Sequence, residues 1–156
     1  MSRNRIDDFG PYQDGMELFD AVVEDMELLR GDPRCYRLIG QQVGSTDSIC
    51  ANIEEGFGRL SRTEFIRFLD IARGSARETL GRYKRMKHWL PREVVAARIN
   101  LLDRIIARLT KSIQTLRANN ATSRSHGVKE SNAQYATRPQ ENADPLTEQE
   151  LEQLLD

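Results

Sequence analysis

The chain of 156 residues is 38% hydrophobic and 30% charged, which is typical of one folded domain with a modest core. No apolar stretch resembles a secretory signal or approaches the roughly 20 residues that cross a bilayer, so a secreted or membrane-spanning protein is not expected. We therefore expect a cytoplasmic protein that makes no membrane contact. Cys35 and Cys50 have no metal-binding spacing and are interpreted as reduced core thiols.

The net charge of −1 conceals an uneven distribution of charge along the chain. Residues 1–58 carry 5 basic and 12 acidic side chains, a net of −7, and residues 120–156 carry 3 and 7, a net of −4. Residues 59–119 carry 15 basic and 5 acidic side chains, a net of +10, and 12 of those 15 cations are arginine. This asymmetry predicts a basic surface on the second half of the folded body.

The first helix is predicted to follow an N-terminal arm, residues 1–13. Asp14 and Glu17 have the spacing of a capping box, which places Asp14 at the N-cap. Apolar residues then recur at intervals of three and four until Gly31-Asp32-Pro33 ends the helix.

The second helix is predicted over residues 35–55. Its Gly44-Ser45-Thr46 segment is weak helix sequence, which we interpret as a point of close approach to another helix. Gly56 is interpreted as the C′ residue of this helix and Ser61 as the N-cap of the next. Gly56-Phe57-Gly58-Arg59 lacks both the preceding strand of a dinucleotide fingerprint and the GK[ST] of a P-loop. We therefore expect a helix–turn–helix connection rather than a phosphate-binding loop.

Two further helices are predicted, over residues 62–90 and from Pro91 to about residues 119–120. Apolar residues recur every three or four positions on both. Tyr83 and Trp89 fall on these apolar positions, so the pattern does not favour aromatic stacking on nucleic-acid bases. Together the four segments predict an all-α fold, an antiparallel up-down-up-down four-helix bundle over residues 14–119.

The remaining residues differ in character. Residues 120–145 contain almost no large apolar side chain and are predicted to form a disordered linker. Residues 146–156 are predicted to form a short amphipathic helix that is not stable alone. Two interpretations stay open, a frayed terminus or an acidic tail that docks in a groove of a protein partner or of its own oligomer. The docking side chains of this tail are Leu146, Leu151, Leu154 and Leu155.

Residues 48–80 carry a specific signature, SICANIEEGFGRLSRTEFIRFLDIARGSARETL. It resembles the pattern SI-x-ANIAEG-x-GR-S-x-x-EF-x-x-FL-x-IA-x-GS-x-x-E of bacterial four-helix-bundle proteins first noticed as products of intervening sequences in 23S rRNA genes. The helix pattern extends the likeness over about residues 14–118. Val43-Gly44 and Glu54 depart from the family, whose members often carry an arginine pair and an alanine there. Both departures lower the positive charge near the second helix.

This family is related to the accessory variability determinant of diversity-generating retroelements, a basic homopentameric barrel that binds its reverse transcriptase and nucleic acid. The resemblance therefore implies a four-helix bundle that assembles as a homo-oligomer, a pentamer by this relationship, and that contacts RNA or DNA. It also implies a protein partner such as a reverse transcriptase.

No pattern in the sequence favours an enzyme. His88 and His126 are the only histidines and neither completes a Glu-x-x-His pair, and no HExxH, Cys/His metal set or nucleophile motif is present. We therefore expect no catalytic residue, no metal and no cofactor. Polar residues of the signature need partners if they are buried, which predicts a structural polar network at one end of the bundle. Its members are Asn52, Glu55, Arg59 and Glu78.

A basic surface for nucleic acid is predicted on the third and fourth helices. Helical spacing brings together Arg62, Arg73, Arg77, Lys84 and Lys87 on the third, and Arg104, Arg108 and Lys111 on the fourth. Such cations bind phosphate backbones with a steep dependence on salt. Two alternatives stay open: plain solvation, or neutralisation by the acidic face of the first helix of a neighbouring subunit, Asp20, Glu24 and Glu27. The predicted function is a nucleic-acid-binding accessory protein, and the alternative is a structural adaptor that recruits a protein through its tail.

Overall fold

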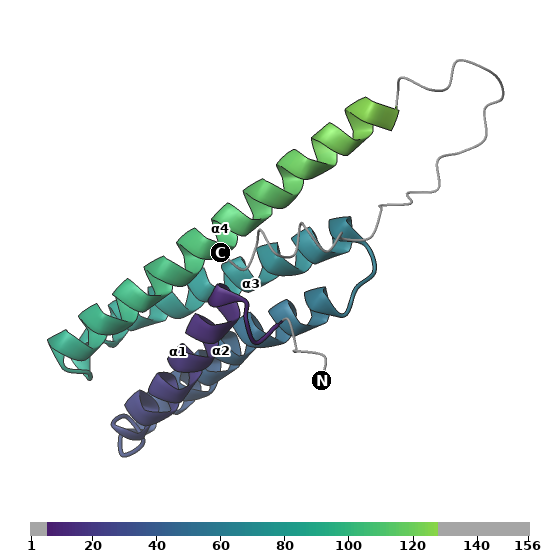
Figure 1. Cartoon of the computed structure of the whole chain (residues 1–156). Coiled ribbons are helices and arrows are strands. Elements are labelled where there is room, and N and C mark those ends of the chain that lie inside the picture. Colours follow the sequence, from purple (N-terminus) through teal and green to yellow (C-terminus); the bar gives the residue numbers. More distant parts are fainter. Residues whose placement is uncertain (1–5, 128–156) are drawn as a thin grey trace.

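The structure is a computed structural model that describes residues 6–127, and the regular structure of that range is helical. Its elements are α1 (Gly10–Glu27), η1 (Pro33–Cys35), α2 (Tyr36–Phe57), α3 (Arg62–Arg85), η2 (Met86–His88) and α4 (Arg92–Gly127), where η denotes a short 3-10 helix. Helix α2 packs against α1 and α3, and α4 packs against α3 and α1. The predicted all-α, up-down-up-down four-helix bundle is therefore confirmed (Figure 1).

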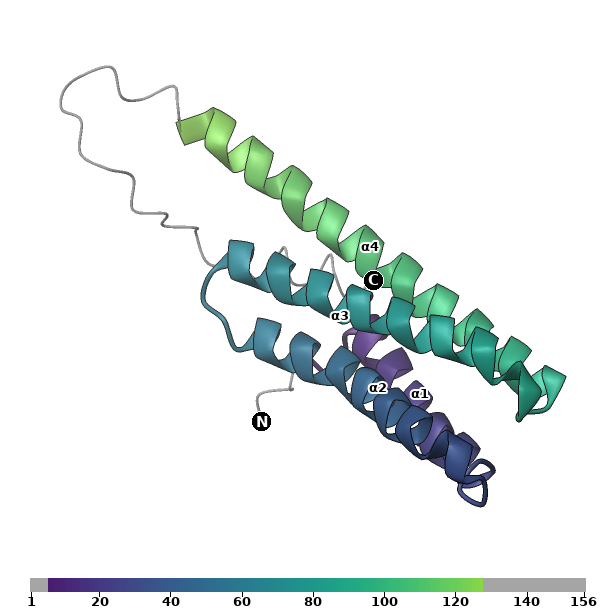
Figure 2. The same ribbon diagram turned by 180° about the vertical axis from the view of Figure 1, so that it is seen from behind.

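The connection between α1 and α2 and the connection between α3 and α4 lie at the same end of the bundle (Figure 1). We call this the turn end. Helix α4 begins there and extends past the other helices at the opposite end (Figure 2). Gly10, the first residue of α1, lies beside the side chain of Arg108, so the part of α4 beyond this residue has no α1 neighbour.

The core runs the length of the bundle. On α1 the buried apolar residues Leu18, Val22 and Met26 are spaced by four, as expected for an amphipathic helix with one face on the core. The largest fully buried side chains are Phe9, Leu18, Leu29, Ile49, Ile53, Phe65, Leu69, Tyr83, Met86, Leu102, Ile105 and Leu109. Cys35 and Cys50 are buried free thiols, as predicted, and burial raises the pKa of Cys50 to about 12.

Two helix boundaries at the N-terminal side differ from the sequence prediction. Helix α1 begins at Gly10, and its N-cap is Phe9 instead of the predicted Asp14, because Pro11 stands in the first turn and no capping side chain is used. Asp14 is therefore not an N-cap. It is a buried residue inside α1, and its carboxylate is bound by Arg104 and Arg108 of α4.

Helix α2 continues through Phe57, so Gly56 lies inside its last turn and is not the C′ residue. Glycine is needed there because a Cβ atom would lie 2.9 Å from Cδ2 of Phe65 and 3.1 Å from Cβ of Phe68. The Phe57 ring lies 5.0 Å from the Phe65 ring, centroid to centroid, which closes this corner of the core. Gly56 thus serves close packing between α2 and α3. Of the predicted approach segment, Gly44 has open space around it, whereas Ser45 is buried and its hydroxyl lies 2.8 Å from that of Thr79 on α3.

The helix–turn–helix connection after Gly56 is confirmed. Helix α3 begins at Arg62, and Ser61 is its N-cap, with the side-chain oxygen accepting a hydrogen bond of 3.4 Å from the backbone N–H of Glu64. Helix α3 ends at Arg85, five residues before the predicted end, and η2 follows.

At the C-terminal side, α4 continues to Gly127, so the predicted end near residues 119–120 is wrong. The other residues of the predicted linker, and the predicted terminal helix with Leu146, Leu151, Leu154 and Leu155, lie outside the described residues. No helix within residues 6–127 combines the length and apolar character that a bilayer crossing requires.

Candidate nucleic-acid interface

The predicted cations of α3 have different surroundings. Arg62 is only 3% exposed and donates a hydrogen bond of 2.9 Å to Oδ1 of Asn120. Arg73 is half-buried, forms an ion pair with Asp70 and donates 3.2 Å to Oγ1 of Thr110. Both side chains join helices within the bundle, so their charges are not available to a ligand in the way that the sequence predicted. The other three, Arg77, Lys84 and Lys87, are exposed and form no ion pair with any residue of the range 6–127.

The predicted arginines of α4 are bound by acidic residues of α1. The Asp14 carboxylate accepts hydrogen bonds of 3.0 Å from Arg104 and 2.8 Å from Arg108, and Glu17 accepts a further one of 3.2 Å from Arg104. Acidic residues of the first helix thus neutralise these arginines, but within one chain and not between subunits. The acidic residues are Asp14 and Glu17, not the expected Asp20, Glu24 and Glu27. Lys111 is exposed and has no ion-pair partner among the described residues.

Exposed cations are densest at the turn end, where α3 passes through η2 into α4. We define the basic end as the five side chains Lys84, Arg85, Lys87, His88 and Arg92, all of them exposed. The four lysine and arginine residues among them form no ion pair within the described part of the chain. Glu93 is the acidic residue in the first turn of α4, so the local balance of charge stays positive.

Two adjoining hollows give this surface its shape. One, of about 670 Å³, is lined by Leu38, Gly81, Lys84, Arg85, Lys87, His88 and Trp89. The other, of about 480 Å³, is lined by Lys87, His88, Arg92, Val95, Ala96 and Ile99. Lys87 and His88 form the boundary between them because they line both. Each hollow therefore combines an apolar lining with cations, as a groove for phosphates and bases requires.

The N-terminus of α4 adds to the positive field of the basic end. Helix dipoles place partial positive charge at the first turn of a helix, and Arg92 occupies the first position of α4. A cation at this position gains nothing for helix stability, whereas Lys84 and Arg85 in the last turn of α3 do favour their helix. The presence of a cation at position 92 is therefore not explained by helix stability.

Trp89 is the aromatic residue of this surface. It is 37% exposed, and its Nε1–H donates a hydrogen bond of 3.2 Å to Oδ2 of Asp32 in the turn between α1 and α2. Its ring stands nearly perpendicular to the His88 ring, with centroids 5.8 Å apart. The sequence pattern had assigned Trp89 to the apolar face of a continuous helix. This is wrong because α3 ends at Arg85 and η2 changes the direction of the following side chains.

Arg85, Arg92 and His88 were not among the predicted site residues. On a projection of residues 62–90, Arg85 is turned about 100° from Lys84, whereas His88 falls on the same side as Lys84. Arg92 lies beyond Pro91 on the next predicted helix, and the turn through η2 brings it to the surface of Lys87 and His88. A local signal was present in the sequence, since five basic side chains including His88 fall between residues 84 and 92, directly around Pro91. Counting charge around the predicted turn, rather than along the helix face, would have found this site.

The predicted polar network does not form among its four members. Glu55 and Arg59 do form an ion pair, and the Arg59 guanidinium lies 5.2 Å from the centroid of the Phe68 ring. Asn52 instead donates 2.7 Å to the backbone oxygen of Ser48 in its own helix. Glu78 forms an ion pair of 3.5 Å with Arg82 of its own helix, and its side chain is exposed.

A polar cluster does join α2 and α3, but it consists of other residues. Ser45 receives a hydrogen bond of 2.7 Å from Arg82, and its hydroxyl lies 2.8 Å from that of Thr79. Gln42 donates 3.2 Å to the backbone oxygen of Thr79. Ser45, Gln42 and Thr79 are buried, so these bonds satisfy polar groups that have lost contact with water, although Oε1 of Gln42 stays without a hydrogen-bond partner.

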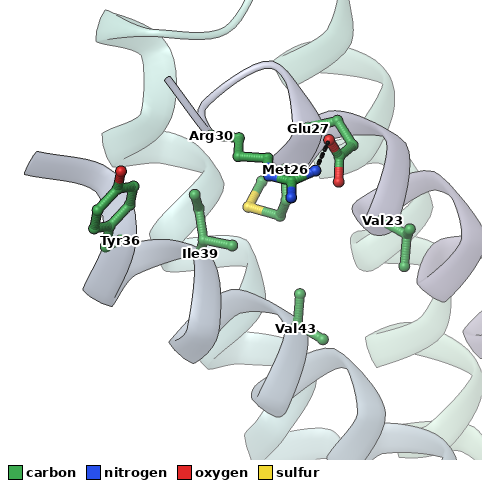
Figure 3. A pocket seen from close by; sticks show the side chains of 7 residues that line it. All are labelled: Val23, Met26, Glu27, Arg30, Tyr36, Ile39 and Val43. Carbon is green, nitrogen blue, oxygen red and sulfur yellow. Dashed lines mark hydrogen bonds and ion pairs between the residues drawn. The ribbon is translucent and has the colours of Figure 1, made fainter. Parts of the chain in front are cut away.

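A separate apolar groove of about 530 Å³ lies between the end of α1 and the start of α2 (Figure 3). Its lining residues are Val23, Met26, Glu27, Arg30, Tyr36, Ile39 and Val43. Tyr36 is 62% exposed and Val23 is 45% exposed, so two large hydrophobic side chains of this groove face solvent together. An ion pair of 3.2 Å between Arg30 and Glu27 spans one side of the groove (Figure 3).

Comparison with known proteins concerns nearly the whole bundle. Residues 7–116 match the family model described as 23S rRNA-intervening sequence protein. A solved structure from Bacteroides thetaiotaomicron, described as a protein with unknown function from the S23 ribosomal protein family, is 26% identical in sequence and has a TM-score of 0.62. That match covers 66% of this chain and 97% of the other. No curated protein matches the chain.

Proposed function

The chain belongs to the family of 23S rRNA-intervening sequence proteins, and from this premise we propose that it is a non-catalytic accessory protein that binds RNA or DNA through the basic end. The observation that carries the proposal is the set of exposed lysine and arginine side chains around the α3–α4 connection that have no ion-pair partner in residues 6–127. Elsewhere on these helices Arg73, Arg98, Arg104 and Arg108 are bound to carboxylates of the same chain.

The density of unpaired cations supports a ligand at the basic end. Other unpaired cations of α3 and α4, such as Arg67, Arg77, Lys111 and Arg117, are spread along the helices, whereas four lie within residues 84–92. Arginines that serve stability are expected to form ion pairs, and arginines that serve solubility are expected to be dispersed over the surface. Here the unpaired cations line two hollows together with Trp89, Leu38 and Ile99. Phosphates are the ligands that such a surface attracts, because each contact releases counterions from the nucleic acid.

We extend the proposal to assembly and partners on the strength of the family relationship. The chain acts as a homo-oligomer, which we propose to be a pentamer. The basic ends of its subunits together create one large positive field. In this form it assists an enzyme of nucleic-acid metabolism, such as a reverse transcriptase. Sedimentation velocity of the full-length protein tests the assembly state, and a monomer at micromolar concentration would remove this part of the proposal.

A charge-reversal experiment tests binding. Fluorescence anisotropy is measured with a labelled RNA hairpin and a labelled DNA duplex, for the full-length protein and for the double variant Lys87→Glu with Arg92→Glu. The matched control is Arg67→Glu with Arg117→Glu, which makes the same change in charge at two other exposed and unpaired arginines of α3 and α4.

We expect the basic-end variant to lose about tenfold or more in affinity at low salt, because at least two phosphate contacts are replaced by repulsion. The control is expected to change by less than about threefold, through its effect on net charge alone. Equal losses in both variants, or no loss in the first, would overturn the assignment of binding to the basic end.

A second candidate function is that of a structural adaptor, which the apolar groove between α1 and α2 favours. Exposed Val23 and Tyr36 could contribute a large part of an apolar protein interface at this groove. The anisotropy experiment also separates these candidates, since an adaptor binds no labelled nucleic acid even at low salt.

A further inference from the structure

We propose that Trp89 is a stacking platform for an unpaired base, so that the basic end prefers single-stranded or looped nucleic acid to continuous duplex. This inference rests on the proposed function and specifies its ligand. It concerns the hollow of about 670 Å³ that is lined by Trp89 together with Lys84, Arg85 and Lys87.

The first support is the fixed orientation of the indole ring. Its N–H is bound to Oδ2 of Asp32, and Asp32 is itself held by Arg34, whose Nη2 lies 2.6 Å from the same oxygen and whose Nε lies 2.9 Å from Oδ1. These bonds from Arg34 hold the pKa of Asp32 well below its ordinary value, so the carboxylate accepts the Trp89 hydrogen bond at any working pH. A ring held in this way stacks on a base with little loss of side-chain entropy.

The second support is the composition of the hollow. Leu38 and Trp89 supply an apolar lining, and Gly81 contributes no side chain to fill it. Its volume lies within the range of sites that hold small organic ligands. Lys84 and Lys87 line the same hollow on long flexible side chains, so a base on the indole brings its own phosphates close to two unpaired cations.

The combination discriminates between forms of nucleic acid. In a duplex the faces of the bases are covered by their neighbours, and only phosphates are presented along its length. A single strand exposes the face of each base, and stacking on an aromatic side chain then adds to the phosphate contacts. The cations therefore bind the phosphates of duplex and single strand alike, whereas Trp89 adds affinity for the single strand only.

The experiment uses the fact that Trp89 is the one tryptophan of the chain, so its emission reports on this hollow directly. Full-length protein is titrated at low salt with a uridine octamer and, separately, with a closed RNA hairpin whose loop is minimal. We expect the octamer to quench the emission with the same midpoint that anisotropy gives for binding, and the hairpin to bind with little quenching.

Substitution provides the quantitative test. Trp89→Leu is expected to weaken octamer binding by about fivefold to a hundredfold, the range that base–aromatic stacking accounts for. The same variant should change hairpin affinity by less than about twofold. Trp89→Phe keeps an aromatic ring but loses the hydrogen bond to Asp32, so it should weaken octamer binding less than Trp89→Leu does. Tyr36→Leu, which removes another exposed aromatic ring outside this hollow, is the matched control and should affect neither.

The outcomes separate this inference from the function on which it rests. Octamer binding without quenching, and with equal affinity for Trp89→Leu, would overturn the stacking role and leave phosphate binding in place. No binding of either nucleic acid would overturn both. A synthetic peptide of residues 146–156 forms a further arm, because it is acidic and rich in leucine. If it quenches Trp89 while the octamer does not, the hollow binds an acidic peptide and the inference is wrong.

Discussion

The Tyr83 hydroxyl of α3 donates a hydrogen bond of 2.6 Å to Oδ2 of Asp25 on α1. The same carboxylate receives hydrogen bonds of 2.8 and 3.1 Å from the Arg98 guanidinium of α4, so one buried acid joins three helices. Asp25 is 4% exposed and Tyr83 is fully buried, and they lie in the last turns of α1 and α3, towards the turn end that also carries the basic end. This cluster therefore positions α3 and α4 relative to α1 close to the proposed interface.

Tyr83→Phe is predicted to destabilise the bundle. Removal of the hydroxyl deprives the buried Asp25 of one donor, which costs about 1–2 kcal/mol of unfolding free energy in urea titrations. Tyr12→Phe is the matched control, because the Tyr12 hydroxyl also donates to a carboxylate, at 2.8 Å to Glu54, but at an exposed position. It is expected to cost less than about 0.5 kcal/mol. Similar losses for the two variants would show that burial does not strengthen the Asp25 bond.

Stability is predicted to fall at alkaline pH. The hydrogen bond to Glu54 raises the pKa of Tyr12 to about 12, burial raises that of Cys50 to about 12, and burial with the bond to Asp25 raises that of Tyr83. The folded state thus keeps protons that the unfolded chain releases near its ordinary values of 9.0 and 10.0. The contribution of these groups is complete below pH 9.0 and is lost as the pH rises towards 12. Urea midpoints that stay constant from neutral pH to about pH 11 would contradict this.

Gly56→Ala is predicted to destabilise the corner between α2 and α3. The new Cβ must displace Phe65, which is fully buried and cannot yield cheaply, so a cost of about 1–3 kcal/mol is expected. Gly40→Ala is the matched variant in the same helix, where a Cβ meets nothing within 4 Å. It should stabilise α2 by about 0.5–1 kcal/mol. If both variants shift the thermal midpoint in the same direction, the close packing at Gly56 is not what selects glycine.

Asp14→Ala is predicted to weaken the contact between α1 and α4. The change leaves Arg104 and Arg108 without their shared buried acceptor, and charged hydrogen bonds of this kind contribute about 1.5–3 kcal/mol. Glu17→Ala removes an exposed partner of Arg104 and should cost less than about 0.5 kcal/mol. Comparison of the unfolding free energies of the two variants checks this prediction. Equal losses would show that the buried Asp14 contributes no more to stability than the exposed Glu17.

Much of the fold followed from local patterns in the sequence. The helical spacing of Val22, Met26 and Leu29 identified much of the buried side of the first predicted helix, although Val23, counted with them, is 45% exposed. Ser61 marked the start of α3. The start of α1 was misplaced because the same Asp14-x-x-Glu17 pattern serves a cap in one context and a tertiary ion pair in another. Nothing local to residue 14 indicates that Arg104 and Arg108 lie opposite it, 90 and 94 positions along the chain.

The candidate interface was predicted only in part. Lys84 and Lys87 were predicted as cations of the third helix and are exposed, although Lys87 lies in η2, whereas Arg85, Arg92 and Trp89 were not predicted as parts of the interface. Beyond Arg85 the periodic pattern still placed Met86 and Leu90 correctly, since both are buried, but it put Trp89 at an apolar position although that side chain is exposed. A pattern that assumes one continuous helix thus becomes unreliable where α3 gives way to η2.

The most direct test of the central claim is the salt dependence of RNA binding, measured by anisotropy for the full-length protein and for Lys87→Gln with Arg92→Gln. If these side chains contact phosphates, binding by the unmodified protein falls steeply with salt, and the slope of log affinity against log salt becomes shallower by about 1–2 in the variant. Equal slopes for the two proteins, or no binding at low salt, would contradict a nucleic-acid interface at the basic end.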